Sequence, residues 1–240
     1  MRLAAAIRTT STIRILAALL CLFSASSCIA QPSSTVRLKL HWPQETKSQL
    51  APAVLWLEPQ PGTAVPAFTP REHYTLLQKN RAFLPHLQVV PVGSAVAFPN
   101  ADPFFHNVFS LFDGKRFDLG LYEAGSTKSV TFSREGVSYI FCNIHPEMSA
   151  VVIALSTPLY AVAGRDESFT LANVPPGSYR LHLWIEGVPL GYLDSLTRTV
   201  HVEGSDLNLG AITITATMPA AHDHANEFGK PYAPVSKSPY

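Results

Sequence analysis

Short runs of β-branched and aromatic residues alternate with turn sequences over most of this chain. The turns carry Gly, Pro, Asn or Asp, as in Val92-Gly93-Ser94 and Pro175-Pro176-Gly177, and no segment shows a long helical period. Many short strands with frequent turns are typical of β-sandwiches. The sequence therefore predicts an all-β fold. The expected strands are residues 36–40, 54–57, 87–90, 95–98, 107–109, 129–132, 138–141, 151–154, 168–171, 179–184, 198–202 and 211–215.

Residues 1–30 have the composition of a secretory signal peptide. Three arginines and no acid lie among them, an apolar run extends from Ile15 to Phe23, and small residues precede Ala30. The apolar run is too short for a stop-transfer helix. We therefore expect cleavage after Ala30 and a periplasmic or secreted protein.

Ser26-Ser27-Cys28 has an alternative interpretation as a lipobox. In that case Cys28 would be lipidated and would anchor the protein to a membrane. Ala25 argues against this, because such boxes prefer a larger aliphatic residue at that position. A membrane is therefore an expected partner only if Cys28 is lipidated.

Loss of the leader changes both the charge and the cysteine content. The full chain has 18 basic and 17 acidic residues, and the loss of three arginines makes the remainder weakly acidic. Such a chain lacks the basic surface that nucleic acids require. Cys142 becomes the one remaining cysteine, so it cannot form an internal disulfide. We expect it to be buried, paired with another molecule, or bound to a ligand.

The sequence Phe141-Cys-Asn-Ile-His-Pro-Glu-Met148 places Cys142, His145 and Met148 at intervals of three residues. A thiolate, two imidazoles and a thioether form the ligand set that suits copper cycling between Cu(I) and Cu(II). A neighbouring strand must supply the second imidazole, and His106 opens such a strand. The sequence therefore predicts one type 1 copper ion bound by His106, Cys142, His145 and Met148.

Each of these residues, taken singly, has an ordinary explanation. Cys142 would be a buried thiol, His106 a loop or core histidine, and Met148 a core residue. Zinc would require more thiolate or a third histidine, and a c-type haem would require Cys-x-x-Cys-His, which is absent. The combination in this order therefore favours copper.

Residues from about 78 to 156 resemble the cupredoxins, the small blue copper proteins of the plastocyanin and amicyanin kind, and the expected copper domain spans residues 76–156. The spacing Cys142-x-x-His145-x-x-Met148, with Pro146 after His145, is that of amicyanin. The segment HLQVVPVGSAVAFPNADPFFHNVFS, residues 86–110, looks like a part of that family. It has, in order, a strand, a glycine turn, a second strand and the chain that leads into a His-Asn pair. The resemblance implies a Greek-key β-sandwich with the four copper ligands proposed above.

The resemblance also implies roles around the ligands. Asn107 matches the residue whose backbone amide binds the copper thiolate and whose side chain braces the ligand loop. Amicyanin has proline at the position of Ile144, so Ile144 here keeps an N–H that would donate to the sulfur. In the family, the histidine that matches His145 reaches the surface in an apolar patch where redox partners dock. The candidates for that patch are Phe104, Phe105, Ile144 and Pro146.

The segment ESFTLANVPPGSYRLHLWIEG, residues 167–187, resembles the Ig-like β-sandwich of carboxypeptidase regulatory-like domains. Such domains start with two strands, which residues 34–75 would supply. We therefore expect residues 34–75 and 157–216 to form one discontinuous sandwich around the inserted copper domain.

The tail 217–240 is rich in proline and has no apolar period, so it is expected to be disordered. His222 and His224 in this tail are expected to be weak metal ligands at most.

The wider chain resembles bacterial secreted proteins described as plastocyanin-like or methylamine utilisation proteins. It is expected to transfer single electrons between periplasmic redox proteins such as a dehydrogenase or a cytochrome. The alternative is copper binding, delivery or sensing, although Met148 and Met218 are the only methionines after the leader. Enzymatic activity is not expected, because a second copper centre would need a His-x-His pair beside the first site. The pair His222 and His224 lies in the tail.

Overall fold

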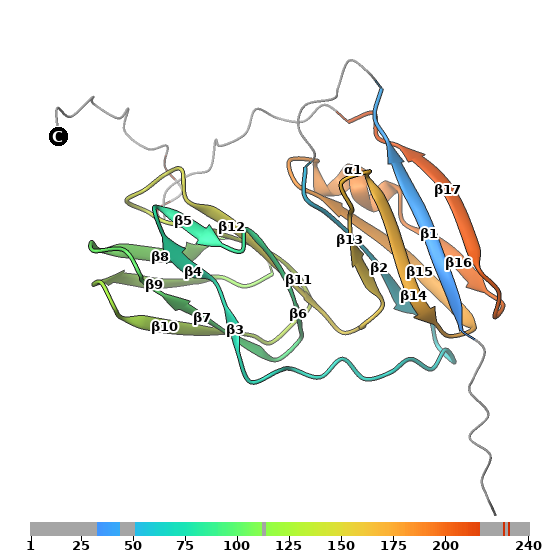
Figure 1. The fold of residues 1–240 in the computed structure, drawn as a ribbon, viewed down its shortest axis with the longest axis horizontal. Helices are drawn as coiled ribbons and strands as arrows, with labels where there is room; N and C mark the ends of the chain where they lie inside the picture. Colours follow the sequence, from blue (N-terminus) through green and yellow to red (C-terminus); the bar gives the residue numbers. More distant parts are fainter. Residues whose placement is uncertain (1–32, 44–50, 112–113, 217–227, 229, 231–240) are drawn as a thin grey trace, which may run out of the picture. The chain divides into compact units, whose positions relative to one another are not determined.

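The computed structural model describes residues 33–43, 51–111, 114–216, 228 and 230, and it confirms the all-β expectation (Figure 1). The expected leader, with Cys28, and the tail residues His222 and His224 lie outside the described residues. The elements are β1 Ser34–His41, β2 Ala53–Pro59, β3 Tyr74–Thr75, β4 Leu77–Lys79, β5 Ala82–Leu84, β6 Leu87–Pro91, β7 Ser94–Pro99, β8 His106–Ser110, β9 Phe117–Tyr122, β10 Thr127–Phe132, β11 Gly136–Phe141, β12 Ser149–Leu155, β13 Tyr160–Val162, β14 Ser168–Val174, β15 Gly177–Ile185, α1 Leu190–Ser195, β16 Arg198–Val202 and β17 Leu207–Thr213.

The larger sheets form two sandwiches. The terminal sandwich combines the sheets β14-β1-β17 and β13-β2-β15-β16. The central sandwich combines β6-β12-β11-β8-β9 with β10-β7-β3, and the hairpin β4-β5 belongs to the same part of the chain (Figure 1). Each sandwich buries the apolar faces of its two sheets against each other, the usual arrangement of such folds.

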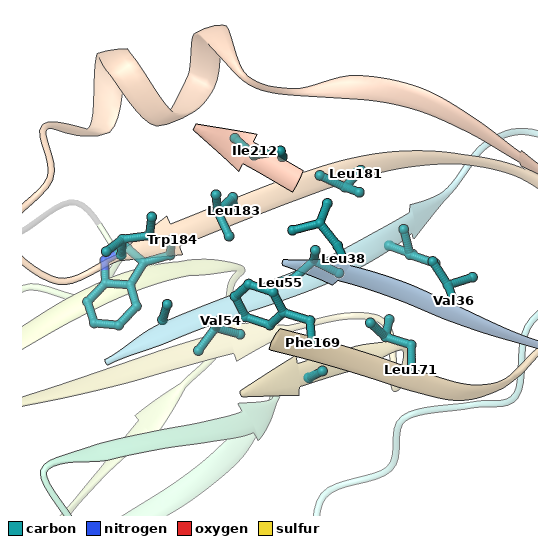
Figure 2. Close-up of a cluster of buried hydrophobic side chains, with 14 of the residues drawn as sticks. Val36, Leu38, Val54, Leu55, Phe169, Leu171, Leu181, Leu183, Trp184 and Ile212 are labelled. Carbon is teal, nitrogen blue, oxygen red and sulfur yellow. The ribbon is translucent and has the colours of Figure 1, made fainter. Parts of the chain in front are cut away.

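Buried and more exposed residues alternate strictly along β1, and the buried ones form part of the core of the terminal sandwich. Val36, Leu38 and Leu40 are buried, and they pack with residues of β2, β14, β15 and β17 in one cluster (Figure 2). β1 pairs antiparallel with β14 and parallel with β17, and β2 pairs with β13 and β15. The assignment of residues 34–75 with 157–216 to one domain, and its likeness to carboxypeptidase regulatory-like domains, remain predictions.

The central sandwich brings the ligand-bearing strands together. β11 pairs with β12 on one side and with β8 on the other, so the start of β8 and the end of β11 lie near each other. The pairing of β3 with β7 extends this sandwich to Tyr74, two residues before the expected start of the copper domain at residue 76. Tyr74 is also part of its core.

β12 is buried on both faces, which explains its continuous apolar sequence. Ala150, Val152 and Ala154 belong to the core cluster of the central sandwich. Val151, Ile153 and Leu155 belong to the cluster that fills the terminal sandwich. The strand that follows the predicted ligand loop is therefore held by both cores.

The sequence did not predict several short elements. β3, β4, β5, β9, β13 and α1 were not expected, and β17 begins before the expected strand at 211–215. Most of these are two to six residues long, too short to show a clear period. Within the described ranges, no helix has the length and apolar character needed to cross a membrane.

Replacement of Leu38 by Ala tests the contribution of β1 to the terminal sandwich. Leu38 is 2% exposed, so we expect the free energy of unfolding to fall by about 2–5 kcal/mol through lost burial and a cavity. The adjacent Lys39→Ala is the control, because Lys39 is exposed and its loss should change stability by less than about 0.5 kcal/mol. Urea unfolding curves measure both, and equal effects would contradict the observed burial pattern.

Candidate metal centre

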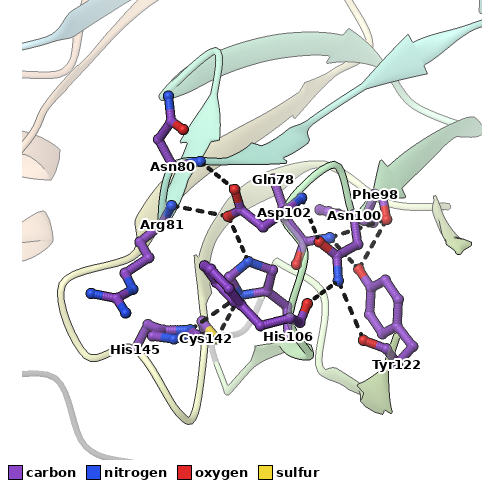
Figure 3. Close-up of polar contacts among 11 residues, drawn as sticks. Gln78, Asn80, Arg81, Phe98, Asn100, Asp102, His106, Tyr122, Cys142 and His145 are labelled. Atoms are coloured by element: carbon purple, nitrogen blue, oxygen red, sulfur yellow. Dashed lines mark hydrogen bonds and ion pairs between the residues drawn. The ribbon is translucent and has the colours of Figure 1, made fainter. Parts of the chain in front are cut away.

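His106, Cys142 and His145 converge at one end of the central sandwich. His106 is the first residue of β8, Cys142 follows β11, and His145 lies in the loop before β12. Cys142 Sγ lies 3.7 Å from His106 Nδ1 and 3.6 Å from His145 Nδ1, and the two Nδ1 atoms are 3.1 Å apart (Figure 3). The structure therefore brings together three of the four predicted ligands.

These separations fit a single bound ion. Typical metal–nitrogen bonds of about 2.0–2.1 Å and metal–sulfur bonds of about 2.3 Å, at tetrahedral angles, separate two nitrogens by about 3.3 Å and nitrogen from sulfur by about 3.6 Å. The measured distances of 3.1, 3.6 and 3.7 Å are close to those values. One thiolate with two imidazoles is also the donor set that copper prefers in trigonal sites.

Asp102 fixes the orientation of His106. The Nε2–H of His106 donates to Asp102 Oδ2 at 2.9 Å, and both side chains are buried (Figure 3). With its proton on Nε2, the imidazole turns the lone pair of Nδ1 toward Cys142. Asp102 was not among the residues that sequence reasoning singled out. Its one sequence signal is its position four residues before His106.

The Asp102 carboxylate is itself held by the hairpin β4-β5. It accepts hydrogen bonds from the backbone amides of Asn80, at 2.6 Å, and Arg81, at 3.0 Å. Burial alone would raise the pKa of Asp102, but the bonds from Arg81, His106 and Asn80 together lower it. The carboxylate therefore stays charged, which is the form that accepts all three bonds.

Further polar contacts order the segment before His106. Asn100 Nδ2 donates to the carbonyl of Phe104 at 2.8 Å, and Asn100 Oδ1 accepts the amide of Asp102 at 3.0 Å (Figure 3). Beside them, the Tyr122 hydroxyl donates to the carbonyl of Phe98 at 2.9 Å. Burial is the main reason that the pKa of Tyr122 is raised, so this hydroxyl remains a neutral donor.

The Cys142 sulfur is buried among hydrogen-bond donors. Burial raises the pKa of the thiol, and the backbone N–H groups of Asn107, Ile144 and His145, which donate to the sulfur, act in the opposite direction. Asn107 Oδ1 also accepts the amide of Asn143 at 3.3 Å. The roles of Asn107 and Ile144 around the sulfur stay predictions. A cation at the centre would complete the stabilisation of the thiolate.

His145 is half-buried beside the other imidazole. Burial lowers the pKa of His145, and the neighbouring His106 lowers it further, so the ring is neutral and able to act as a ligand. The Phe104 ring packs against both imidazoles, with centroid distances of 5.2 Å to His106 and 5.4 Å to His145.

The residues expected to form an apolar patch around His145 differ in how far they are exposed to solvent. Phe105 is 55% exposed and Ile144 44% exposed. Phe104 and Pro146 are half-buried, and the Arg81 guanidinium lies over the Phe104 ring at 5.4 Å. Phe105 and Ile144 therefore present apolar surface to solvent, whereas Phe104 mainly supports the ligand rings. The role of these residues in partner docking stays a prediction.

Met148 closes the ligand loop through its backbone. Its amide donates to the carbonyl of His145 at 2.9 Å, and its carbonyl accepts the amide of Cys142 at 3.3 Å. Its side chain is fully buried in the same core cluster as Cys142. The thioether of Met148 as a fourth ligand stays a prediction.

Comparison with known proteins yields structural likenesses alone, since no protein-family model and no curated protein matches the sequence. A copper-containing nitrite reductase from Thermus scotoductus SA-01 is 24% identical over 34% of this chain and 22% of its own, with a TM-score of 0.33. A purple cupredoxin from Nitrosopumilus maritimus is 23% identical over 34% of this chain and 99% of its own, with a TM-score of 0.31. Amicyanin from Paracoccus versutus is 22% identical over 36% of this chain and 85% of its own, with a TM-score of 0.33. At such scores these likenesses carry no weight in assigning a function.

Replacement of Asp102 by Asn tests the support of His106. The amide keeps one acceptor oxygen and loses the charge, so it cannot accept all three bonds. We expect copper affinity to fall by about 10- to 100-fold, the usual effect of losing a partner behind a ligating histidine. Competition titration with a chelator measures this loss.

Asp206→Asn is the matched control. Asp206 also accepts a backbone amide, that of Thr35 at 2.9 Å, but it is exposed and lies in the terminal sandwich. Its replacement should leave copper affinity unchanged. Equal affinities for the Asp102 variant and the unmodified protein would show that the carboxylate does not support the site.

Proposed function

We propose that this protein is a periplasmic or secreted blue copper protein of the cupredoxin kind that carries single electrons between redox partners. Its ligands would be His106, Cys142 and His145, with the Met148 thioether as the weak fourth ligand. The observation that supports the proposal is the convergence of Sγ and two Nδ1 atoms, 3.1 to 3.7 Å apart, at a largely buried point. Bound copper would supply one-electron chemistry by alternating between Cu(I) and Cu(II).

The residues of this chain would hold the ligands still while the charge of the centre changes. Asp102 keeps the proton of His106 on Nε2, so Nδ1 remains available to the metal. Burial raises the pKa of Cys142, and the amides of Asn107 and Ile144 act against this rise, so they would stabilise negative charge on the sulfur once a cation is bound. A cage fixed in this way has little rearrangement to make between the two oxidation states, which favours rapid electron transfer.

His145 would be the route to a partner. It is the more exposed of the two histidines, and Phe105 and Ile144 expose apolar surface close to it in the sequence. A periplasmic dehydrogenase or cytochrome with an apolar surface around its own redox centre would suit this end of the sandwich. This role needs no catalytic residue, and we propose that the protein is not an enzyme.

A visible absorption spectrum during titration with Cu(II) tests the proposed function. We expect an intense thiolate-to-copper band that saturates at one copper per chain, disappears with ascorbate and returns on reoxidation. Cys142→Ser should abolish the band, because both imidazoles remain but the thiolate is lost. His73→Ala is the control: His73 is highly exposed and distant in sequence from the ligands, so the band should persist.

Other outcomes would count against electron transfer. A band that survives in Cys142→Ser would mean that another group binds the copper. Copper that gives no such band and is lost on dialysis would instead favour the alternative function of copper binding, delivery or sensing.

A further inference from the structure

His86 connects the terminal sandwich to the base of the ligand loop. It lies between β5 and β6, and its Nε2 is 2.7 Å from Oε1 of Glu186, which directly follows β15. Its Nδ1 is 3.0 Å from the carbonyl oxygen of Ser149, the first residue of β12. Its own carbonyl accepts the amide of Val151 at 2.7 Å. One side chain therefore contacts both the terminal sandwich and the strand that begins directly after Met148.

The chemistry of the two acceptors defines the charge of His86. A backbone carbonyl and a carboxylate both accept hydrogen bonds, so both contacts form together when both ring nitrogens carry protons. The shared proton belongs on the imidazole, because histidine is ordinarily the weaker acid, with a pKa of about 6.5 against about 4.3 for glutamate. In this arrangement His86 is an imidazolium that donates in two directions.

The position of Ser149 sets the base of the ligand loop. Ser149 pairs with Phe141 at the end of the β11–β12 ladder, so these two residues mark the points where the loop leaves the sheet. Within the loop, the amides of Cys142 and Met148 donate to the carbonyls of Met148 and His145. A shift of Ser149 would therefore move Met148 and, through it, the backbone of Cys142.

We propose that His86 is a positioning residue, held in place by Glu186 of the terminal sandwich, that fixes the base of the copper-ligand loop by donating to the Ser149 carbonyl. The terminal sandwich would then have a defined role at the metal centre. We call this arrangement of Glu186, His86 and Ser149 the loop clamp. Its effect on copper rests on the proposed function, but the clamp itself does not require the metal.

The loop clamp depends on pH in a defined direction. The hydrogen bond to Glu186 is the main reason that the pKa of His86 is raised, although partial burial opposes it. Tyr139 on β11 faces Glu186, and burial raises the pKa of this tyrosine, so it stays neutral. Because the folded-state pKa of His86 is raised, the stabilisation that the loop clamp provides is complete below about pH 6.5, the ordinary pKa of histidine. This stabilisation is lost as the pH rises through the folded-state pKa of His86.

Amide hydrogen exchange of the metal-free full chain tests the loop clamp. We expect the protection factors of the Met148 and Cys142 amides to fall by about 2- to 12-fold as the pH rises through the folded pKa of His86. This range corresponds to the net free energy of one hydrogen bond. In Glu186→Gln the fall should occur at lower pH, because the carboxylate no longer raises the pKa. In His86→Gln the profile should be flat, at the low level of protection.

Glu58→Gln is the matched control. Glu58 accepts from Nε2 of His182 at 2.8 Å within the terminal sandwich, so the change removes the same kind of partner without touching the loop. Its profile should equal that of the unmodified protein. A profile unchanged in His86→Gln, or an equal shift in Glu58→Gln and Glu186→Gln, would overturn the proposal.

The NMR signals of the His86 imidazole and the copper spectrum distinguish a failure of the loop clamp from a failure of the proposed electron transfer. Nitrogen-15 NMR should show both ring nitrogens of His86 protonated below its pKa and a midpoint above 6.5 that falls in Glu186→Gln. A normal midpoint would overturn the loop clamp even where the copper band forms. If exchange and NMR behave as expected but no copper band forms, the clamp holds and the proposed electron transfer fails.

Discussion

The placement of a buried thiol between two imidazoles is the constraint on which the ligand-bearing end of the central sandwich depends. A thiolate is costly to bury, and three backbone amides offset this cost only in part, since the pKa of Cys142 remains raised. A bound cation would satisfy the sulfur and both Nδ1 atoms together. The surrounding contacts, from the Asp102 carboxylate to the bracing side chain of Asn107, hold these three atoms within 3.1 to 3.7 Å.

The sheets explain how residues 36 positions apart reach this point. His106 begins β8, Cys142 directly follows the neighbouring strand β11, and the tight loop to β12 returns His145 to the same end. β12 is buried on both faces, so the end of the loop that joins β12 cannot move independently of the two cores. The loop clamp adds a polar contact to this apolar support, because Glu186 reaches the same strand through His86.

Much of this arrangement was predictable from the sequence, for physical reasons. Alternating runs such as Val36 to Leu40 carry their own strand signal, and three soft or imidazole side chains at intervals of three residues indicate a metal-binding chemistry. Asp102 was missed because its role depends on amides of Asn80 and Arg81, which reach it through a short hairpin with no clear period. The pairing of His86 with Glu186 joins residues 100 positions apart, and no local pattern reveals it.

Copper K-edge X-ray absorption of the protein loaded with one copper, recorded in both oxidation states, tests the central claim most directly. A preformed cage of two imidazoles and one thiolate predicts the same sulfur and nitrogen ligands in Cu(I) and Cu(II), with small changes in bond length. Loss of the sulfur or of an imidazole on reduction, or a coordination shell of oxygen atoms, would contradict the account.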